Sequence, residues 1–295
     1  MERREFLKRT FLAIAGFEIS RHLKFGKLSY AQSKGSEIYV AKGGNPEENT
    51  YRAIKGVGGI EKFVKRGSKV VIKPNIAWNR TPEQAATTNP DVVLGIVKLC
   101  KKAGASEVIV IDNPCNPWQV TYKISGIAEV VEKGGGIMKP PIKFKQVNIE
   151  GTKILKNAEI LEEVLDSDVF INVPIVKVHG GSKVTIGMKN LMGIVKDRGF
   201  FHRTDLHRCI AEITYYIKPS LTIMDATKIL LTMGPQGPGV VKDIGIVAAG
   251  TDIVSLDAYG TKLLGQDPYN IPHIKIAEEM GLGIADLNKV NIKNV

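Results

Sequence analysis

The chain has 295 residues and a formal net charge of +11, and 43% of its residues are hydrophobic and 24% charged. This composition is that of a globular protein and excludes a wholly disordered, collagenous or coiled-coil chain. Residues 1–31 hold seven basic and three acidic residues, so the remainder keeps 34 basic against 27 acidic residues, or +7. Because those charges are interspersed and only 6% of residues are aromatic, we expect no nucleic-acid partner, and a small anion suits the basic excess.

The N-terminal segment carries the pattern of a twin-arginine signal. Arg3 and Arg4 stand before a Phe-Leu-Lys run at 6–8. Ser29 and Ala31 are small residues at the positions that a signal peptidase recognises. We therefore predict a signal peptide over 1–31, recognition by the twin-arginine export machinery, and a periplasmic or other extracytoplasmic location. The alternative is an uncleaved basic amphipathic helix that lies on a membrane surface or packs on the body. Later residues contain no run of about 18 apolar residues, so we expect no membrane span in the mature chain.

Short aliphatic runs predict the strands of a buried sheet. They lie at 37–41, 69–72, 108–111, 169–173, 221–224 and 244–248. None alternates strictly between apolar and polar residues, which is typical of strands covered on both faces. Helical patterns fall between them, at 47–64, 91–102, 124–132, 160–165, 205–217, 252–264 and 274–280. This alternation predicts an α/β fold with a mainly parallel, doubly wound sheet and helices on both faces.

Residues 134–157 interrupt the alternation of strands and helices. Glycine and proline clusters open this segment, and two short runs at 144–149 and 152–155 predict a small β-hairpin. We expect an insertion or a sub-domain boundary there, within one α/β domain over 32–295.

Polar residues follow four of the predicted strands. They comprise lysines, carboxamides, aspartates and a histidine, namely Lys73, Asn75, Asp112, Asn172, Lys177, His179 and Asp225. In open parallel sheets, ligands bind outside the carboxyl ends of the strands. Lysine binds carboxylate or phosphate, carboxamides orient a ligand, and aspartate or histidine transfers a proton or holds a metal. The alternative for Asp112 and Asp225 is that each caps the next turn or helix and has no chemical role.

A second polar cluster lies at 187–209, in a segment with little regular pattern before residue 205. Lys189 and Asn190 extend the anion site, and His202 is a second candidate for proton transfer. His202 and His207, together with Cys115 near the end of a strand, are candidate metal ligands. The two histidines are five residues apart, so they lack the i, i+4 spacing of a helical zinc pair, and the alternative is that His207 packs at a helix start.

Five segments together resemble the domain of unknown function 362 family, and in particular its twin-arginine-exported branch. They are residues 73–75, 172–179, 187–193, 201–207 and 224–226. Some members of that family carry a fused ferredoxin-like module whose clustered cysteines bind four-iron four-sulfur clusters. This chain has three dispersed cysteines and no such module. The resemblance implies the fold, the export and the importance of these segments, and it implies no particular reaction.

These observations predict an exported protein that binds a small anionic substrate or cofactor in a cleft at the carboxyl edge of the sheet. Its expected residues fall into three groups: Lys73, Lys177 and Lys189 bind the anion, Asn75 and Asn190 orient it, and His179, His202, Asp112 and Asp225 supply proton transfer, a metal ligand or a lysine partner. Redox or metal-dependent chemistry stays open, as does the cofactor, a metal or an iron–sulfur cluster being the candidates. The alternative is a non-catalytic solute or cofactor carrier, so the sequence leaves enzymatic activity undecided.

Overall fold

The computed structural model describes residues 35–295, so the predicted signal peptide lies outside the described residues. Its strands are β1 (Ser36–Lys42), β2 (Lys69–Pro74), β3 (Glu107–Val110), β4 (Ile137–Met138), β5 (Phe144–Asn148), β6 (Asn157–Leu161), β7 (Val169–Val173), β8 (Ile175–His179), β9 (Lys183–Thr185), β10 (Leu221–Leu230), β11 (Val241–Gly250) and β12 (Val290–Asn294). Its α-helices are α2 (Pro46–Gly56), α3 (Pro90–Lys102), α4 (Trp118–Ile124), α5 (Ile127–Lys133), α6 (Glu162–Leu165), α7 (Gly187–Asn190), α8 (Gly199–Arg203), α9 (Leu206–Tyr216), α10 (Ile253–Leu263) and α11 (Pro272–Glu279). Five short 3-10 helices complete the described part: η1 (Ile60–Lys62), η2 (Pro82–Gln84), η3 (Leu191–Ile194), η4 (Pro268–Asn270) and η5 (Leu287–Lys289).

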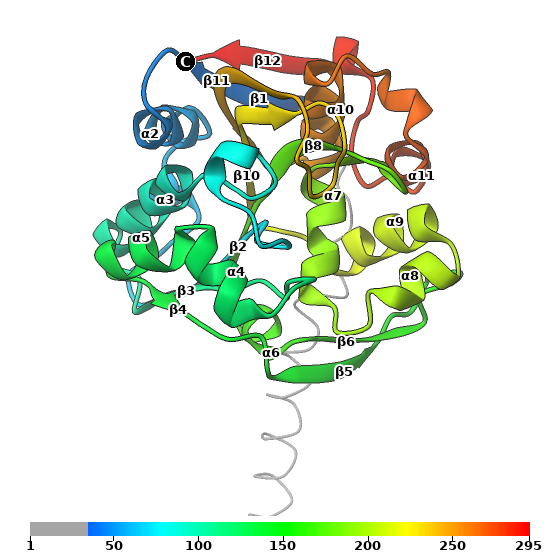
Figure 1. The fold of residues 1–295 in the computed structure, drawn as a ribbon, viewed down its shortest axis with the longest axis horizontal. Coiled ribbons are helices and arrows are strands. Elements are labelled where there is room, and N and C mark those ends of the chain that lie inside the picture. The colour runs from blue at the N-terminus through cyan, green and yellow to red at the C-terminus, as the bar shows by residue number, and fades with distance from the viewer. Residues whose placement is uncertain (1–34) are drawn as a thin grey trace, which may run out of the picture.

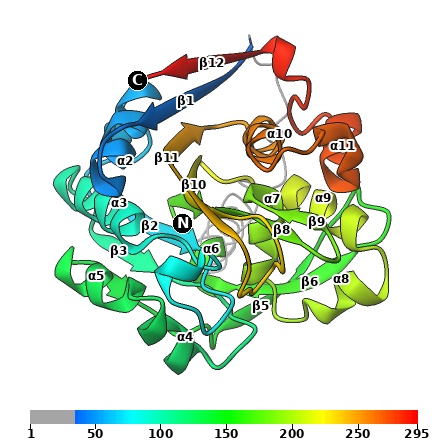
Figure 2. The same cartoon turned by 45° about the horizontal axis from the view of Figure 1, so that its top comes forward.

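The main sheet is mostly parallel, as predicted. Its strands run in the order β12-β1-β11-β10-β7-β2-β3-β4. Beside this path, β8 pairs with β10, and β9 pairs with β8. The pairs β2–β3, β2–β7, β3–β4, β10–β7 and β10–β8 are parallel. In contrast, β11 runs antiparallel to both β1 and β10. Figure 2 shows β1 and β12 side by side at one edge of the sheet.

Helices cover both faces of the sheet, which confirms the doubly wound arrangement (Figure 1). Successive strand residues point to opposite faces, so Val70 and Ile72 of β2 pack with α2, α3 and α5. Val71, between them, belongs to the core on the other face, where Ile210 of α9 and Leu256 of α10 lie. The sheet is therefore buried on both sides, which explains why its strands are continuous apolar runs.

Helix starts follow the capping signals in the sequence. Asn89 precedes Pro90, the first residue of α3, and its side chain accepts the Asp91 N–H at 2.9 Å. Asp205 similarly accepts the Arg208 N–H at 2.9 Å and begins α9. The buried residues of α3 and α9 belong to the cores on opposite faces of the sheet.

The hairpin near residue 150 differs from its prediction. β5 pairs with β6 in an antiparallel two-stranded sheet, and the predicted second strand at 152–155 is part of the connecting loop. Glu212 of α9 explains this difference, because its buried carboxylate accepts the N–H groups of Lys153, Ile154 and Leu155 at 2.7, 3.0 and 2.7 Å. Those N–H groups are therefore not available to a strand partner.

Several elements were not predicted, among them α4, α7, α8, β12 and the β8–β9 hairpin. The hairpin changes the setting of two site residues. Lys177 and His179 accordingly lie within strand β8 and not in a loop after β7. Between residues 35 and 295, no helix combines the length and the apolar character that crossing a bilayer requires.

Candidate functional site

The short helix α7 lies at the centre of the candidate site and is fixed at its start by Asp257 of α10. The Asp257 carboxylate accepts the N–H groups of Gly187 and Met188 at 2.6 and 3.0 Å. Burial raises the pKa of Asp257 to about 8, while these two hydrogen bonds lower it. Residue 187 is glycine because a Cβ there would lie 2.7 Å from the Asp257 carboxylate. The contact positions the next turn, which carries Lys189 and Asn190.

Asn190 joins three predicted site residues into one hydrogen-bond network. Its Oδ1 accepts from Lys73 Nζ at 2.9 Å and from Asn75 Nδ2 at 3.0 Å. Its Nδ2 donates to Asn172 Oδ1 at 2.9 Å and to the Lys73 carbonyl at 3.2 Å. The carboxyl ends of β2 and β7 thus meet α7 through side chains that are all buried.

Lys73 and Asp112 form a buried ion pair. Lys73 Nζ lies 2.8 Å from Asp112 Oδ1, and the two side chains are 1% and 2% exposed. Asp112 Oδ2 also accepts the Ile76 N–H at 2.7 Å. Burial lowers the pKa of Lys73, and the charge of Asp112 opposes that shift. A Cβ at Gly193 would come within 2.1 Å of Asp112 Oδ1, so glycine is required where η3 crosses the pair.

Lys177 and Lys189 are equally buried but have no carboxylate partner in residues 35–295. Lys177 Nζ donates to the Ala86 carbonyl at 2.6 Å and to Asn75 Oδ1 at 3.1 Å. Lys189 Nζ lies 3.3 Å from the Met192 Sδ, a weak acceptor. Burial, and then the charge of Lys189, lowers the pKa of Lys177 to about 7. Burial lowers the pKa of Lys189 to about 8.

Arg198 and Cys115 connect this buried cluster to the surface. The Arg198 guanidinium donates to the carbonyls of Asn113 and Pro114 at 2.7 and 2.6 Å. It also lies 3.4 Å from Cys115 Sγ, and Cys115 is exposed. Arg198 is close enough to Lys189 to lower its pKa further. Two backbone carbonyls and the Cys115 sulfur therefore hold this guanidinium in place, and no carboxylate of residues 35–295 pairs with it.

The four histidines of the described part gather around Lys189. Burial, followed by the charge of Lys189, lowers the pKa of His179 to about 3, and burial and Lys189 also lower the pKa of His202. His179 Nδ1 accepts two backbone N–H groups, from residues 181 and 182, at 2.9 and 3.2 Å. His207 stacks on His273, with ring centroids 5.3 Å apart and Nδ1 atoms 3.1 Å apart. These imidazoles are therefore neutral near pH 7 and add no positive charge to the site.

Two of these groups were missed by sequence reasoning. His273 is fully buried on α11, and Asp257 is fully buried on α10. Each lies in an apolar helical stretch far along the chain from Lys189, so only the packing of α10 and α11 brings it to the site (Figure 2). No local motif marks either residue.

Asp225 lies apart from the lysines and has a structural contact, though not with the next turn or helix as the capping alternative has it. Its carboxylate accepts the Asn89 N–H at 2.7 Å, and the N–H and hydroxyl of Thr227 at 2.9 and 2.7 Å. Burial raises the pKa of Asp225, and these hydrogen bonds oppose that shift. Asp225 thus ties β10 to the start of α3.

The candidate metal ligands are not brought together. His207 contacts His273 while Cys115 contacts Arg198, and His202 is exposed on α8. Over residues 35–295, no group of three His, Cys, Asp or Glu side chains is placed to hold a metal ion. The other two cysteines are buried in the cores on opposite faces of the sheet.

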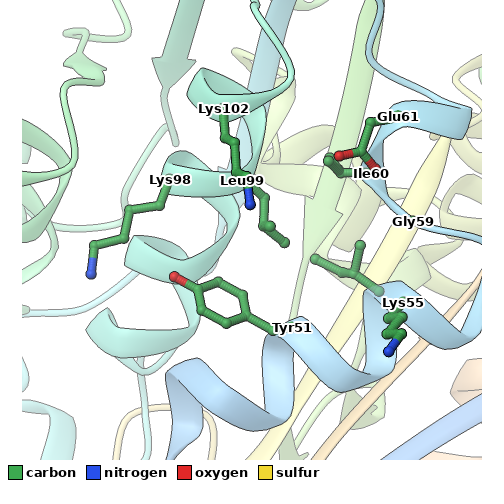
Figure 3. A pocket seen from close by; sticks show the side chains of 9 residues that line it. Tyr51, Lys55, Gly59, Ile60, Glu61, Lys98, Leu99 and Lys102 are labelled. Carbon is green, nitrogen blue, oxygen red and sulfur yellow. The ribbon is translucent and has the colours of Figure 1, made fainter.

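A groove of about 370 Å³ lies between α2, η1 and α3, outside the buried cluster (Figure 3). Tyr51 and Leu99 line it together with the lysines at positions 55, 98 and 102. These lysines are exposed, and Lys98 pairs with Glu47 at 2.7 Å. Solvated lysines are a weak reason for a ligand site, so the buried cluster is the better candidate.

Comparison with known proteins identifies the family. A family model described as Domain of unknown function (DUF362) matches residues 70–262. The chain belongs to this family. The match spans Lys73 through Arg198, and it ends before His273.

This DUF362 member is 28% identical over 245 residues to the thylakoid-associated protein sll1697 of Synechocystis sp. (strain ATCC 27184 / PCC 6803 / Kazusa), which covers 78% of this chain and 73% of that protein. Among solved structures, the lactate racemase apoprotein from Thermoanaerobacterium thermosaccharolyticum is similar with a TM-score of 0.49, at 13% identity over 80% of this chain. A protein from Thermotoga maritima is similar with a TM-score of 0.40, at 12% identity over 79% of this chain. The chain spans 58% of the length of each of these two solved chains.

Proposed function

We propose that this DUF362 protein binds a small anion at Lys177 and Lys189. One observation carries the proposal: both lysines are buried, 1% and 8% exposed, and neither has a carboxylate partner in the described part of the chain. The buried carboxylate at the edge of the cluster, Asp112, is already paired with Lys73. Residues 35–295 therefore bury two lysine ammonium groups and supply no carboxylate to pair with them.

Buried charge without a counter-charge is costly, which favours a ligand as the missing partner. Transfer of an ammonium group out of water costs several kcal/mol unless an opposite charge or good hydrogen bonds offset it. The lowered pKa values of Lys177 and Lys189, about 7 and 8, reflect that cost. An anion next to them would stabilise their charged forms, so binding would be accompanied by proton uptake.

The same groups support proton transfer to or from the bound anion. A lysine with a pKa of about 7, such as Lys177, exists in both protonation states near neutral pH. His179, whose pKa is lowered to about 3, is a neutral neighbour. An enzyme would use these groups on its ligand, whereas a carrier would release the ligand unchanged, so incubation with a bound ligand and product analysis separates the two.

We also propose that the protein reaches its site of action by the twin-arginine route, as the residues at 3–8 indicate. Cell fractionation of the full chain expressed with its own N-terminus tests this. The native chain is expected in the exported fraction with a mass shortened at Ala31, and the double variant Arg3→Lys, Arg4→Lys in the cytoplasm. Export of both chains alike would contradict the proposal.

Calorimetric titration of the full chain with malonate, at constant ionic strength, tests the anion site. Lys177→Met and Lys189→Met are each expected to weaken malonate binding by at least about tenfold, because a charge pair is removed without loss of side-chain length. Lys98→Met removes the same charge from the exposed groove and is the matched control, with unchanged binding expected. The proposal would be refuted if the Lys189→Met variant had the same melting temperature as the native protein and bound malonate with the same affinity.

A further inference from the structure

We infer that the ligand of this site carries two negative charges, in the form of a small dicarboxylate or a phosphate. This inference rests on the proposed function and specifies its ligand class. The reason is a count of charged groups: in residues 35–295 the cluster holds more basic side chains than carboxylates that pair with them.

The positive charges of the cluster come from four side chains, Lys73, Lys177, Lys189 and Arg198. One carboxylate, Asp112, faces them, and it lies 2.8 Å from Lys73. Arg198 donates to two backbone carbonyls and lies 3.4 Å from Cys115 Sγ, and no carboxylate of residues 35–295 pairs with it. Lys177, Lys189 and Arg198 thus have no carboxylate partner among the ion pairs of residues 35–295.

Cys115 is an acidic group next to the cluster, and its thiolate form would raise the pKa of Lys177 and Lys189. The remaining titratable groups near the cluster do not change this count. Asp257 accepts the N–H groups at the start of α7, and Asp225 accepts from Asn89 and Thr227. The four histidines have lowered pKa values and are neutral near pH 7. Asp197, near Arg198 in the sequence, pairs with Arg203 at 2.7 Å on the surface.

Two charges are needed because the two buried lysines repel each other. After burial, the charge of Lys189 is the largest cause of the lowered pKa of Lys177. A single carboxylate that touches both ammonium groups cancels only one of their charges and leaves the other buried. A dianion cancels both, and the charge of the half-buried Arg198, which is close enough to Lys189 to lower its pKa, adds to the attraction for an anion. The site should therefore select ligands by charge.

Malonate and acetate provide the test, because they share one functional group and differ in charge. Each is titrated into the full chain at about pH 8 and constant ionic strength, with inorganic phosphate as a third probe. Malonate is expected to bind at least about tenfold more tightly than acetate, a difference of about 1.4 kcal/mol. Titrations in buffers of different ionisation enthalpy should show greater proton uptake for malonate than for acetate, since both lysines become fully charged. Tighter binding of phosphate than of malonate would assign the ligand to the phosphate class, and tighter binding of malonate would assign it to the dicarboxylate class.

Variants separate charge selection from general damage to the site. Lys189→Met and, independently, Lys177→Met should reduce the preference for malonate over acetate to about threefold or less, while Lys98→Met should keep the native preference. Equal native affinity for acetate and malonate overturns the dianion inference and leaves the anion site itself standing. Failure of all three anions to bind overturns the proposed function instead.

Discussion

Lys73 and the pair Lys177 and Lys189 lie in the same buried region, but they differ in the partners of their ammonium groups. Lys73 has a carboxylate, a carboxamide and a backbone carbonyl within 2.9 Å of its ammonium group. Lys189 has a thioether at 3.3 Å, and Lys177 has a carbonyl and a carboxamide. A buried lysine with a purely structural role is paired with a carboxylate, as Lys73 is with Asp112. A buried charge without one is a reason to look for a ligand.

Breaking the compensated pair should have the largest effect on stability. Asp112→Asn leaves the Lys73 ammonium buried without its carboxylate, so the free energy of unfolding is expected to fall by about 3–5 kcal/mol. Urea unfolding measures this loss. The double variant Asp112→Asn, Lys73→Met should recover part of it, because no buried charge is then left unpaired. A loss below about 1 kcal/mol in Asp112→Asn would mean that the pair is solvated and not compensating.

A substitution at Gly193, where η3 approaches this pair, should have the next largest effect on the free energy of unfolding. Gly193→Ala places a Cβ 2.1 Å from Asp112 Oδ1 and 2.6 Å from Lys73 Cε, so the pair must separate or the backbone must move. We expect a loss of about 1–3 kcal/mol, which denaturant unfolding measures. Gly180→Ala is the control, since no atom lies within 4 Å of its added Cβ. Equal stability of the two variants would contradict the close approach.

The uncompensated lysines should make stability rise with pH. The pKa of Lys177 is lowered from 10.5 to about 7 in the folded chain, so between those values the unfolded chain binds more protons. The free energy of unfolding therefore increases as pH rises from 7, by up to about 1.4 kcal/mol per pH unit from this group. Below about pH 7 both states are charged and the penalty is at its full value.

Lys177→Met isolates that contribution, because the other titrating groups are common to both chains. The difference in free energy of unfolding, native minus variant, measured between about pH 7 and pH 9, should grow with pH. A difference that stays constant would show that Lys177 titrates at the same pKa in the folded and unfolded chains.

The residues at the ends of two strands were predictable from the sequence, and the wrong placement of Asp225 has a physical cause. Lys73 and Asn172 are the last but one residues of the neighbouring parallel strands β2 and β7, and Asn75 directly follows β2. Parallel strands end at a common edge. Asp225 was expected at that edge too, but β10 continues to Leu230, so Asp225 lies inside the strand. A strand's length depends on its partners, here β8 and β11, which the local sequence does not reveal.

The charge balance of the site was not predictable from the sequence. The lysines themselves were, since Lys177 and Lys189 lie in polar motifs. Asp112 follows β3, and the position of β3 decides which lysine it pairs with. The register between β2 and β3 places Asp112 next to Lys73. The role of Asp257 likewise depends on the packing of α10 on α7.

The smallest expected effect is at Lys98, which has a partner and is exposed. Its pair with Glu47 is 2.7 Å long, with side chains 43% and 25% exposed, and such pairs contribute about 0–1 kcal/mol. Lys98→Met should therefore leave both the free energy of unfolding and malonate affinity nearly unchanged. If it weakened malonate binding as much as Lys189→Met does, the groove between α2 and α3 would be the anion site. Burial without a counter-charge would then not be what distinguishes a binding lysine in this fold.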